Sequence, residues 1–330
     1  MRIKVKTLLY QYARNLRSVV QKPLLSIIVV LIKKRIIDPE AVYSVFSKYG
    51  FYFLKKSHYL PIPDEGDLTY AYSKQSELVG LDMNESYALD LLDNVILKYK
   101  SEFNAFPVNK TDDDSVYYLL NGNYMAIDGN VYYSLIRHLK PNKIIEIGSG
   151  FSTRLACNAI SKNIQESNSK TQLICIEPHP REMLKDNLPK FLELKVSKVQ
   201  DVGLDMFESL RAGDILFIDS SHALRTGGDV WWEYCEILPR LASGVYVHIH
   251  DIHLPKPYPR HYFNQHTYWN EQYLLQAFLT FNPKFEVIWP GNYLMTKYPE
   301  KIRKAFLPEY DLMLSKYSFA EPASFWMRVQ

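Results

Sequence analysis

The stretch "KIIEIGSGFSTR" at residues 143–154 sets a turn with two glycines directly behind a run of β-branched residues. An apolar run of this length followed by a turn and a helical pattern predicts a strand, a turn and a helix. Further apolar runs follow at 172–177, 214–219 and 244–251. We expect helices from Ser152, near Arg181 and through 229–238, so that strands and helices alternate. This order predicts a doubly wound α/β fold with a mostly parallel sheet buried on both faces.

The sequence pattern changes near residue 125. Before it, helical patterns such as "SYALDLLDNVILKYKSEF" at 86–103 alternate with loops that contain prolines and acids. After it, strands dominate, and "ASFWMRV" at 323–329 is predicted to close the sheet. We therefore expect a mostly helical accessory region at 1–125 and one α/β domain at 126–330.

Composition limits the partners and the compartment. Lysine and arginine exceed aspartate and glutamate by only 39 − 36 = 3, so no nucleic-acid partner is expected. Cys157, Cys175 and Cys235 lie in apolar segments without paired spacing, which predicts buried free thiols. Free thiols favour a reducing, cytoplasmic location.

The segment 22–35, "KPLLSIIVVLIKKR", holds ten residues between basic ends, only one of them polar. It is too short to span a bilayer, which takes about 20 apolar residues. Two interpretations stay open: a helix packed on the main domain, or a peripheral contact with the inner face of the membrane.

The glycine turn has the position of a nucleotide-binding loop, but two residues bear on the ligand. A dinucleotide fingerprint requires a third glycine where this chain has Thr153. Glu146 precedes the turn and would repel a pyrophosphate, whereas a carboxylate suits the cationic groups of S-adenosylmethionine. Glu177 ends the next strand, where it can accept both hydroxyls of a ribose. Asp201 and Val202 follow the third strand and either flank an adenine or form a solvated turn.

These motifs, together with "EPHP", "ILFIDSSH" and "GVYVHIHDIHLPKPYP", resemble those of the class I S-adenosylmethionine-dependent methyltransferases. The resemblance is closest to the bacterial branch associated with surface-glycan and natural-product modification. It covers residues 126–290 and implies a seven-stranded, Rossmann-like sheet with S-adenosylmethionine as the cofactor. The cofactor-binding residues that it implies are Glu146, Gly148, Ser149, Gly150, Ser152, Glu177, Asp201, Val202 and Asp219.

The resemblance also bears on catalysis. Asp219 matches the acid that ends the fourth strand beside the methyl group, and metal-assisted relatives complete a divalent-ion site with an acidic pair after the fifth strand. Here that pair is His250 and Asp251, so Asp219, His250 and Asp251 are the candidate metal ligands, and the imidazole disfavours magnesium. The catalytic candidates are Asp219, His222, His250, Asp251 and His253.

Ordinary structural roles remain open for several of these residues. His222 either takes part in the site or caps a helix, and His248 either lies in the site or packs in the core. The aromatic residues Tyr258, Tyr262, Tyr268 and Trp269 form either a substrate wall or ordinary packing.

The function expected is therefore an S-adenosylmethionine-dependent O-methyltransferase acting on a sugar or other hydroxyl of a surface glycan or secondary metabolite, in polysaccharide biosynthesis. The alternatives are a non-catalytic Rossmann-like binding module and an NAD-dependent oxidoreductase.

Overall fold

A computed structural model describes residues 22–113, 115–181 and 188–330. Packing divides the chain into two compact units, residues 1–62 and 63–330. The boundary predicted at residue 125 lies inside the second unit, because segment 117–127 and helix α4 (Glu85–Asn94) share one core with helix α6 (Asp128–Leu139). The predicted helix near Arg181 falls on residues 182–187, which lie outside the described residues.

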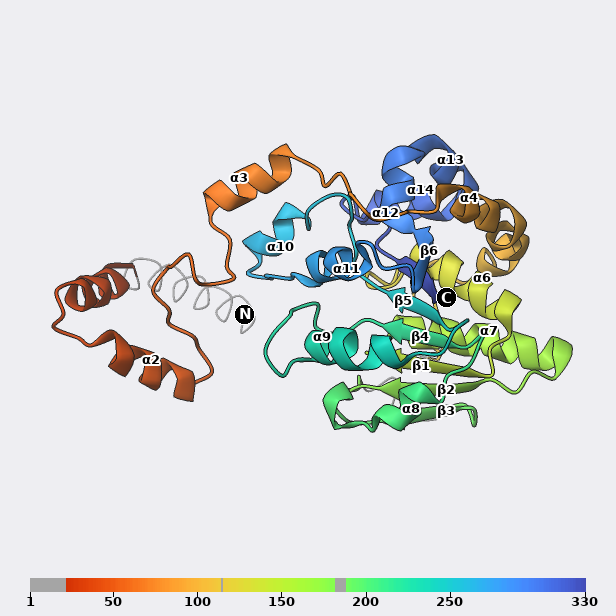
Figure 1. Ribbon diagram of the computed structural model, residues 1–330, viewed down its shortest axis with the longest axis horizontal. Helices are drawn as coiled ribbons and strands as arrows, with labels where there is room; N and C mark the ends of the chain where they lie inside the picture. The colour runs from red at the N-terminus through yellow and green to blue at the C-terminus, as the bar shows by residue number, and fades with distance from the viewer. Residues whose placement is uncertain (1–21, 114, 182–187) are drawn as a thin grey trace, which may run out of the picture. The chain divides into compact units, whose positions relative to one another are not determined.

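The second unit contains the predicted sheet, whose strand order is β3-β2-β1-β4-β5-β7-β6. Strands β1 to β5 pair in parallel, and β7 is antiparallel to both of its neighbours. Figure 1 shows β3, β2, β1, β4 and β5 stacked in this order. The strands are β1 (Lys143–Ile147), β2 (Gln172–Ile176), β3 (Leu192–Lys195), β4 (Ile215–Ile218), β5 (Tyr246–Ile249), β6 (Phe285–Pro290) and β7 (Phe325–Val329).

Alternation along each strand sends side chains into two separate cores. Ile144 of β1 joins one core with α6 and α7, whereas its neighbour Ile145 joins the other core with α8, α9 and α11. Burial on both faces explains why the strands are continuous apolar runs, as the sequence predicted. The helices among the described residues of this unit are α3 (Glu65–Ser73), α4, α5 (Lys100–Phe103), α6, α7 (Phe151–Ser167), α8 (Leu204–Glu208), α9 (Asp229–Trp232), α10 (Arg260–Asn264), α11 (Glu271–Leu279), α12 (Gly291–Lys297), α13 (Pro299–Ala305) and α14 (Glu309–Lys316), with 3₁₀ turns η1 (Ile96–Tyr99), η3 (Val199–Asp201) and η5 (Leu238–Arg240) and the π-helical segment η4 (Glu233–Ile237).

The described part of the first unit contains helical segments, and residues 51–62 that follow them are not helical. Residues 22–33 form a helix, and α2 (Pro39–Lys48) begins after Asp38, whose side chain accepts from the Glu40 amide. Among the described residues, no helix has the length and apolarity needed to cross a bilayer.

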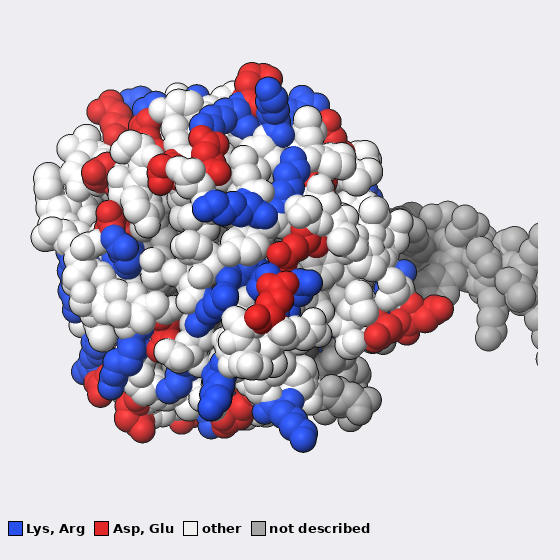
Figure 2. Space-filling view, turned by 90° about the vertical axis from the view of Figure 1, so that its right-hand side faces the viewer, with Lys and Arg blue, Asp and Glu red and all other residues white. Residues whose placement is uncertain are grey.

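On the face in Figure 2, basic and acidic side chains lie interspersed among uncharged ones.

The three cysteines are free, but the prediction that all are buried is wrong. Cys175 is buried on β2, Cys157 is partly buried, and Cys235 is exposed because it lies on the solvent side of η4.

Candidate active site

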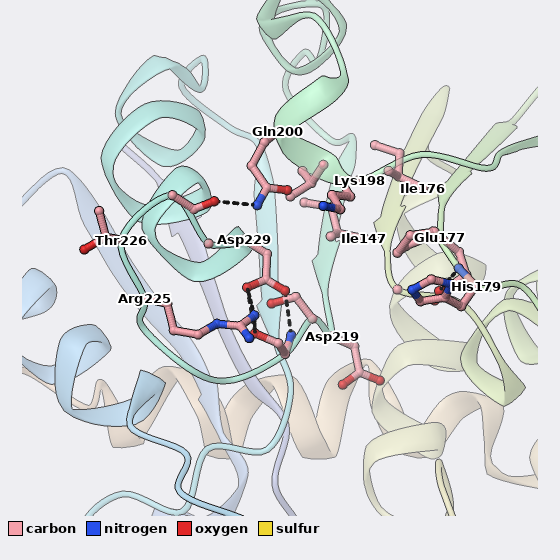
Figure 3. A pocket seen from close by; sticks show the side chains of 17 residues that line it. Ile147, Ile176, Glu177, His179, Lys198, Gln200, Asp219, Arg225, Thr226 and Asp229 are labelled. Carbon is pink, nitrogen blue, oxygen red and sulfur yellow. Dashed lines mark hydrogen bonds and ion pairs between the residues drawn. The ribbon is translucent and has the colours of Figure 1, made fainter. Parts of the chain in front are cut away.

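A cavity of about 600 Å³ lies at the carboxyl ends of β1, β2 and β4. In an open α/β sheet this edge is where ligands bind. The cavity is lined by the strand ends and by residues 198–200, 219–221 and 225–229 (Figure 3). Its volume is in the range of small-molecule and cofactor sites.

Glycine is present at the two positions of the turn for different structural reasons. Gly148 has φ +82°, and a Cβ there would lie 2.1 Å from the carbonyl oxygen of Asp219 at the end of β4. Gly148 is thus required by the packing of the turn on the neighbouring strand. A Cβ on Gly150 would meet no protein atom within 4 Å, so the space beside it is free for a ligand.

Glu146 lies beneath the turn rather than in the cavity. Its carboxylate is fully buried, where it accepts from the hydroxyl of Ser152 and, at 3.7 Å, from the thiol of Cys175. Burial raises the pKa of Glu146 to about 8, although the hydrogen bonds oppose that rise. The contact with Ser152 ties β1 to the first turn of α7.

The other predicted cofactor residues are divided between the cavity and its surroundings. Glu177 lines the cavity and accepts from the amides of His179 at 2.7 Å and Ser149 at 3.2 Å. Asp201 and Val202 follow the third strand as expected, but the residues that line the cavity there are 198–200. Asp219 lines it from the end of β4.

One wall of the cavity was missed by the sequence analysis. The Ser221 hydroxyl donates to Asp229 at 2.6 Å, and the Gln200 amide donates to the Gly227 carbonyl at 3.0 Å (Figure 3). The loop from 219 to 229 therefore closes over the cavity edge. Its sequence signal is the pair Gly227 and Gly228 just before the start of α9.

Beside this cavity, His222 links three carboxylates. Its Nε2 lies 3.2 Å from Asp219 and 3.3 Å from Asp251, and its Nδ1 lies 2.8 Å from Glu271. Burial opposes protonation of this imidazole, but hydrogen bonds with Asp219 and Glu271 outweigh it and raise the pKa of His222 well above its usual range. The side chain of His222 contacts three acids and does not cap α9, the helix that follows it, whose N-cap is Gly228.

His250, which directly precedes Asp251 in the chain, completes the cluster. Its Nδ1 lies 3.4 Å from Asp219 and 3.6 Å from Asp251, and its Nε2 lies 3.4 Å from Asp128. Burial would raise the pKa of Asp219, but the charge of His250 and hydrogen bonds from both histidines hold it well below its usual range. We name Asp128, Asp219, His222, His250, Asp251 and Glu271 the histidine–carboxylate cluster.

Backbone geometry at the cluster is unusual. His222 has φ +57° and Asp251 has φ +56°, a region that non-glycine residues seldom adopt. The carbonyl of His222 is held by the amides of Asn270 at 3.0 Å and Glu271 at 3.2 Å. Such conformations cluster at functional sites, where the surrounding structure over-determines them.

The cluster fits a divalent cation in ligand type and spacing. One ligand atom each from Asp219, His222 and Asp251 lies within 4.8 Å of the others. The His222 nitrogen is 3.2 and 3.3 Å from the two carboxylate oxygens. Ligand atoms about 2.0 to 2.2 Å from one ion are about 3 Å apart, so the spacing agrees. The converging set contains His222, whereas the sequence analysis placed His250 there.

His253 and His248 are separate from the cluster. His253 lies in a second cavity, and neither of its ring nitrogens has a hydrogen-bond partner among the described residues. His248 is fully buried on β5 and stacks on Phe217 with ring centroids 4.1 Å apart, so it packs in the core. Sequence analysis missed Asp128 and Glu271, because each is an acidic residue in the first turn of a helix, where acids are common for reasons of helix stability.

Comparison with known proteins adds to this geometry. Residues 145–252 match the model of a methyltransferase domain family. An uncharacterized protein of Archaeoglobus fulgidus is 31% identical over 175 residues, which cover 51% of this chain and 77% of that protein.

Solved structures give weaker matches. The Podospora anserina methyltransferase PaMTH1, in its structure bound to S-adenosyl-L-homocysteine (SAH), has a TM-score of 0.39 at 15% identity, and the match covers 84% of this chain and all of that one. An O-methyltransferase from Bacillus cereus in complex with SAH has a TM-score of 0.34 at 14% identity, covering 73% and 91%.

The strand order, the cavity at the glycine turn and the domain match define the class of protein. The chain belongs to the class I S-adenosylmethionine-dependent methyltransferases. This assignment removes the NAD-dependent oxidoreductase from the alternatives.

Proposed function

We propose that this protein methylates a hydroxyl group of a sugar in a surface glycan, or of a secondary metabolite. The observation that carries the proposal is the position of the histidine–carboxylate cluster. Asp219 lines the cofactor cavity, whereas His250 and Asp251 line the second cavity. A group held in one cavity and a group held in the other would meet at the cluster.

The charge of the cluster suits transfer of a methyl group from a sulfonium. Four carboxylates contact the imidazoles of His222 and His250, so acids outnumber the bases. Buried charge without compensation is costly, and a cationic ligand would supply the missing positive charge. This excess of acids also supports a catalytic enzyme over a non-catalytic binding module.

Methylation of a hydroxyl requires that its proton be removed. S-adenosylmethionine, when bound, supplies an electrophilic methyl group whose C–S bond breaks as the acceptor oxygen forms the new C–O bond, and the electron pair stays on sulfur. Asp251 faces the acceptor side, where its carboxylate oxygen can take the hydroxyl proton as a general base. Glu271 orients His222 between Asp219 and Asp251.

A divalent ion is a second way to remove that proton. Asp219, His222 and Asp251 would hold it, and when bound it would lower the pKa of an acceptor hydroxyl as a Lewis acid. A mixed imidazole and carboxylate set suits manganese, iron or zinc better than magnesium.

The test is methyl transfer from labelled S-adenosylmethionine to alcohol, amine and carbon acceptors, before and after exhaustive chelation. We expect label on a hydroxyl oxygen. Activity lost on chelation and restored by one ion would assign an essential metal, and full activity in the chelated enzyme would exclude one. Transfer to amine or carbon acceptors alone would overturn the proposal.

We also propose that segment 22–35 contacts the inner face of the membrane. Leu24, Leu25 and Ile27 are more than half exposed, and Lys33, Lys34 and Arg35 follow them. Exposed apolar side chains beside basic ones bind anionic lipid surfaces. Flotation of the full chain with phosphatidylglycerol vesicles, compared with a Leu24→Ser, Leu25→Ser, Ile27→Ser variant, tests this: equal flotation would exclude it.

A further inference from the structure

The second cavity has a volume of about 460 Å³ and is formed by three segments that are distant in the chain. Residues 122–128 precede and begin α6, residues 250–262 follow β5, and residues 313–323 lead into β7. Asp128, His250 and Asp251 form the wall that it shares with the histidine–carboxylate cluster. A ligand in this cavity would therefore present a group to the cluster.

His253 marks the polar side of the cavity. The residue is 4% exposed, and its Nδ1 and Nε2 have no hydrogen-bond partner among the described residues. Its backbone amide donates to Gln272 at 3.0 Å, and its ring packs 5.8 Å from the ring of Tyr258 and 6.1 Å from that of Tyr262. Buried polar groups are nearly always hydrogen-bonded, so the held ring has an unused donor and acceptor.

The remaining lining combines aromatic surfaces with fixed oxygens. Tyr262 lines the cavity, and Phe319, 81% exposed, lies at its edge with its ring 6.0 Å from that of His261. Glu321 is fixed by Lys256 at 2.9 Å and by the Asn292 amide at 3.1 Å. The surface therefore offers apolar faces together with hydrogen-bonding groups.

We propose that this second cavity is the acceptor site, that its ligand is a neutral pyranose ring, and that His253 hydrogen-bonds the sugar hydroxyls. The inference rests on the proposed O-methyltransferase function and names the substrate class. A pyranose has C–H faces for Tyr262 and Phe319 and several hydroxyls for His253 and the carboxylates. An acidic sugar is disfavoured, because Asp128, Asp251 and Glu321 line the same space.

The test uses methyl glycosides of glucose, galactose, mannose and rhamnose as probes, with catechol as a phenolic probe and methyl glucuronide as an anionic one. Binding to the SAH-saturated protein is measured by calorimetry, and methyl transfer by label. We expect a neutral glycoside to bind and to be methylated. Binding of catechol or the glucuronide, with no neutral glycoside bound, would overturn the inference.

Variants test the role of His253 itself. His253→Phe keeps a packed ring and removes both nitrogens, so it should raise KM for the glycoside about tenfold or more, the cost of one lost hydrogen bond to a buried group. His253→Gln should restore part of the affinity. His266→Phe, an exposed histidine outside the cavity, is the matched control. An unchanged KM in His253→Phe would exclude the role.

Two further measurements keep the inference distinct from the proposed function. SAH affinity and thermal stability of His253→Phe show whether the variant is folded. If its folding is impaired, Tyr262→Leu replaces it as the test, and because this variant removes an aromatic face it should raise KM for the glycoside. Failure of the wild-type protein to bind SAH would overturn the proposed function. SAH binding with transfer to a hydroxyl that is not on a sugar would overturn only the inference.

Discussion

The cofactor cavity and the histidine–carboxylate cluster lie next to each other but are built differently. The cofactor cavity is formed by strand ends and a glycine turn, where Gly148 packs against the backbone of Asp219. The cluster is formed by side chains from four places in the chain, among them Asp128 of α6 and Glu271 of α11. Backbone features fix the place of the ligand, and long-range side-chain contacts fix the chemistry.

Asp219 belongs to both regions and gives the largest expected effect. Asp219→Asn keeps the shape and removes a charge that contacts His222 and His250. We expect kcat to fall by about 10² or more, because the variant disturbs the histidines that contact Asp251, the proposed general base, with a smaller change in SAH affinity.

Steady-state kinetics and calorimetry on the same preparation check this, with the exposed Asp205→Asn as the control. A loss of SAH affinity with kcat preserved would place Asp219 in the cofactor cavity alone and break the comparison.

Gly148 and Gly150 test whether the turn serves the fold or the ligand. Gly148→Ala places a Cβ against backbone at φ +82°, so we expect a loss of about 3 kcal/mol or more in the free energy of unfolding. A Cβ at Gly150 has open space around it, so Gly150→Val should leave stability unchanged while SAH binding is lost. Urea unfolding and calorimetry measure both, and equal destabilisation by the two variants would contradict the distinction.

Glu146 tests the cofactor side through pH. The pKa of this carboxyl is about 8 in the folded protein, against 4.5 when it is exposed. A raised pKa stabilises the fold fully below about 4.5, and that stability is lost as pH rises through about 8. The free energy of unfolding should therefore fall with pH by at most about 1.4 kcal/mol per unit because of this group.

Glu146→Gln should flatten that slope, measured by urea unfolding of the ligand-free protein at several pH values. The exposed Glu300→Gln is the control. Because Glu146 lies beneath the turn, SAH affinity should persist in Glu146→Gln, and its complete loss would instead support a direct contact with the cofactor.

The same contrast explains what the sequence could predict. The sheet, the turn and the closeness of Asp219 to Asp251 followed from local patterns, because β4 and β5 are neighbours in a parallel sheet. Glu271 and Asp128 are acids in the first turns of helices, a position that helix stability alone favours. Their contacts with His222 and His250 depend on the tertiary packing of α11 and α6, which no local pattern contains.

Glu271 gives the smallest expected effect and tests the cluster alone. Its carboxylate is fully buried and lies 2.8 Å from Nδ1 of His222, which directs Nε2 toward Asp219 and Asp251. Partners of this kind orient a functional histidine, and their loss typically costs about 10- to 100-fold. We expect Glu271→Gln to lower kcat by that factor and to leave KM for S-adenosylmethionine unchanged.

The matched control is Glu233→Gln. Glu233 is also a fully buried glutamate, but its carboxylate accepts from the Ser220 hydroxyl at 3.0 Å, and burial together with the charges of Glu271 and Asp229 raises its pKa well above the usual range. We expect Glu233→Gln to retain kcat, and Glu271→Ala to lose more than Glu271→Gln because it also removes the acceptor. Nitrogen NMR of His222 provides a readout that a merely structural role would not change, since the Nδ1 signal should shift in Glu271→Gln. If kcat and the Nδ1 signal both match the wild type, Glu271 does not position His222, and the cluster is smaller than its contacts indicate.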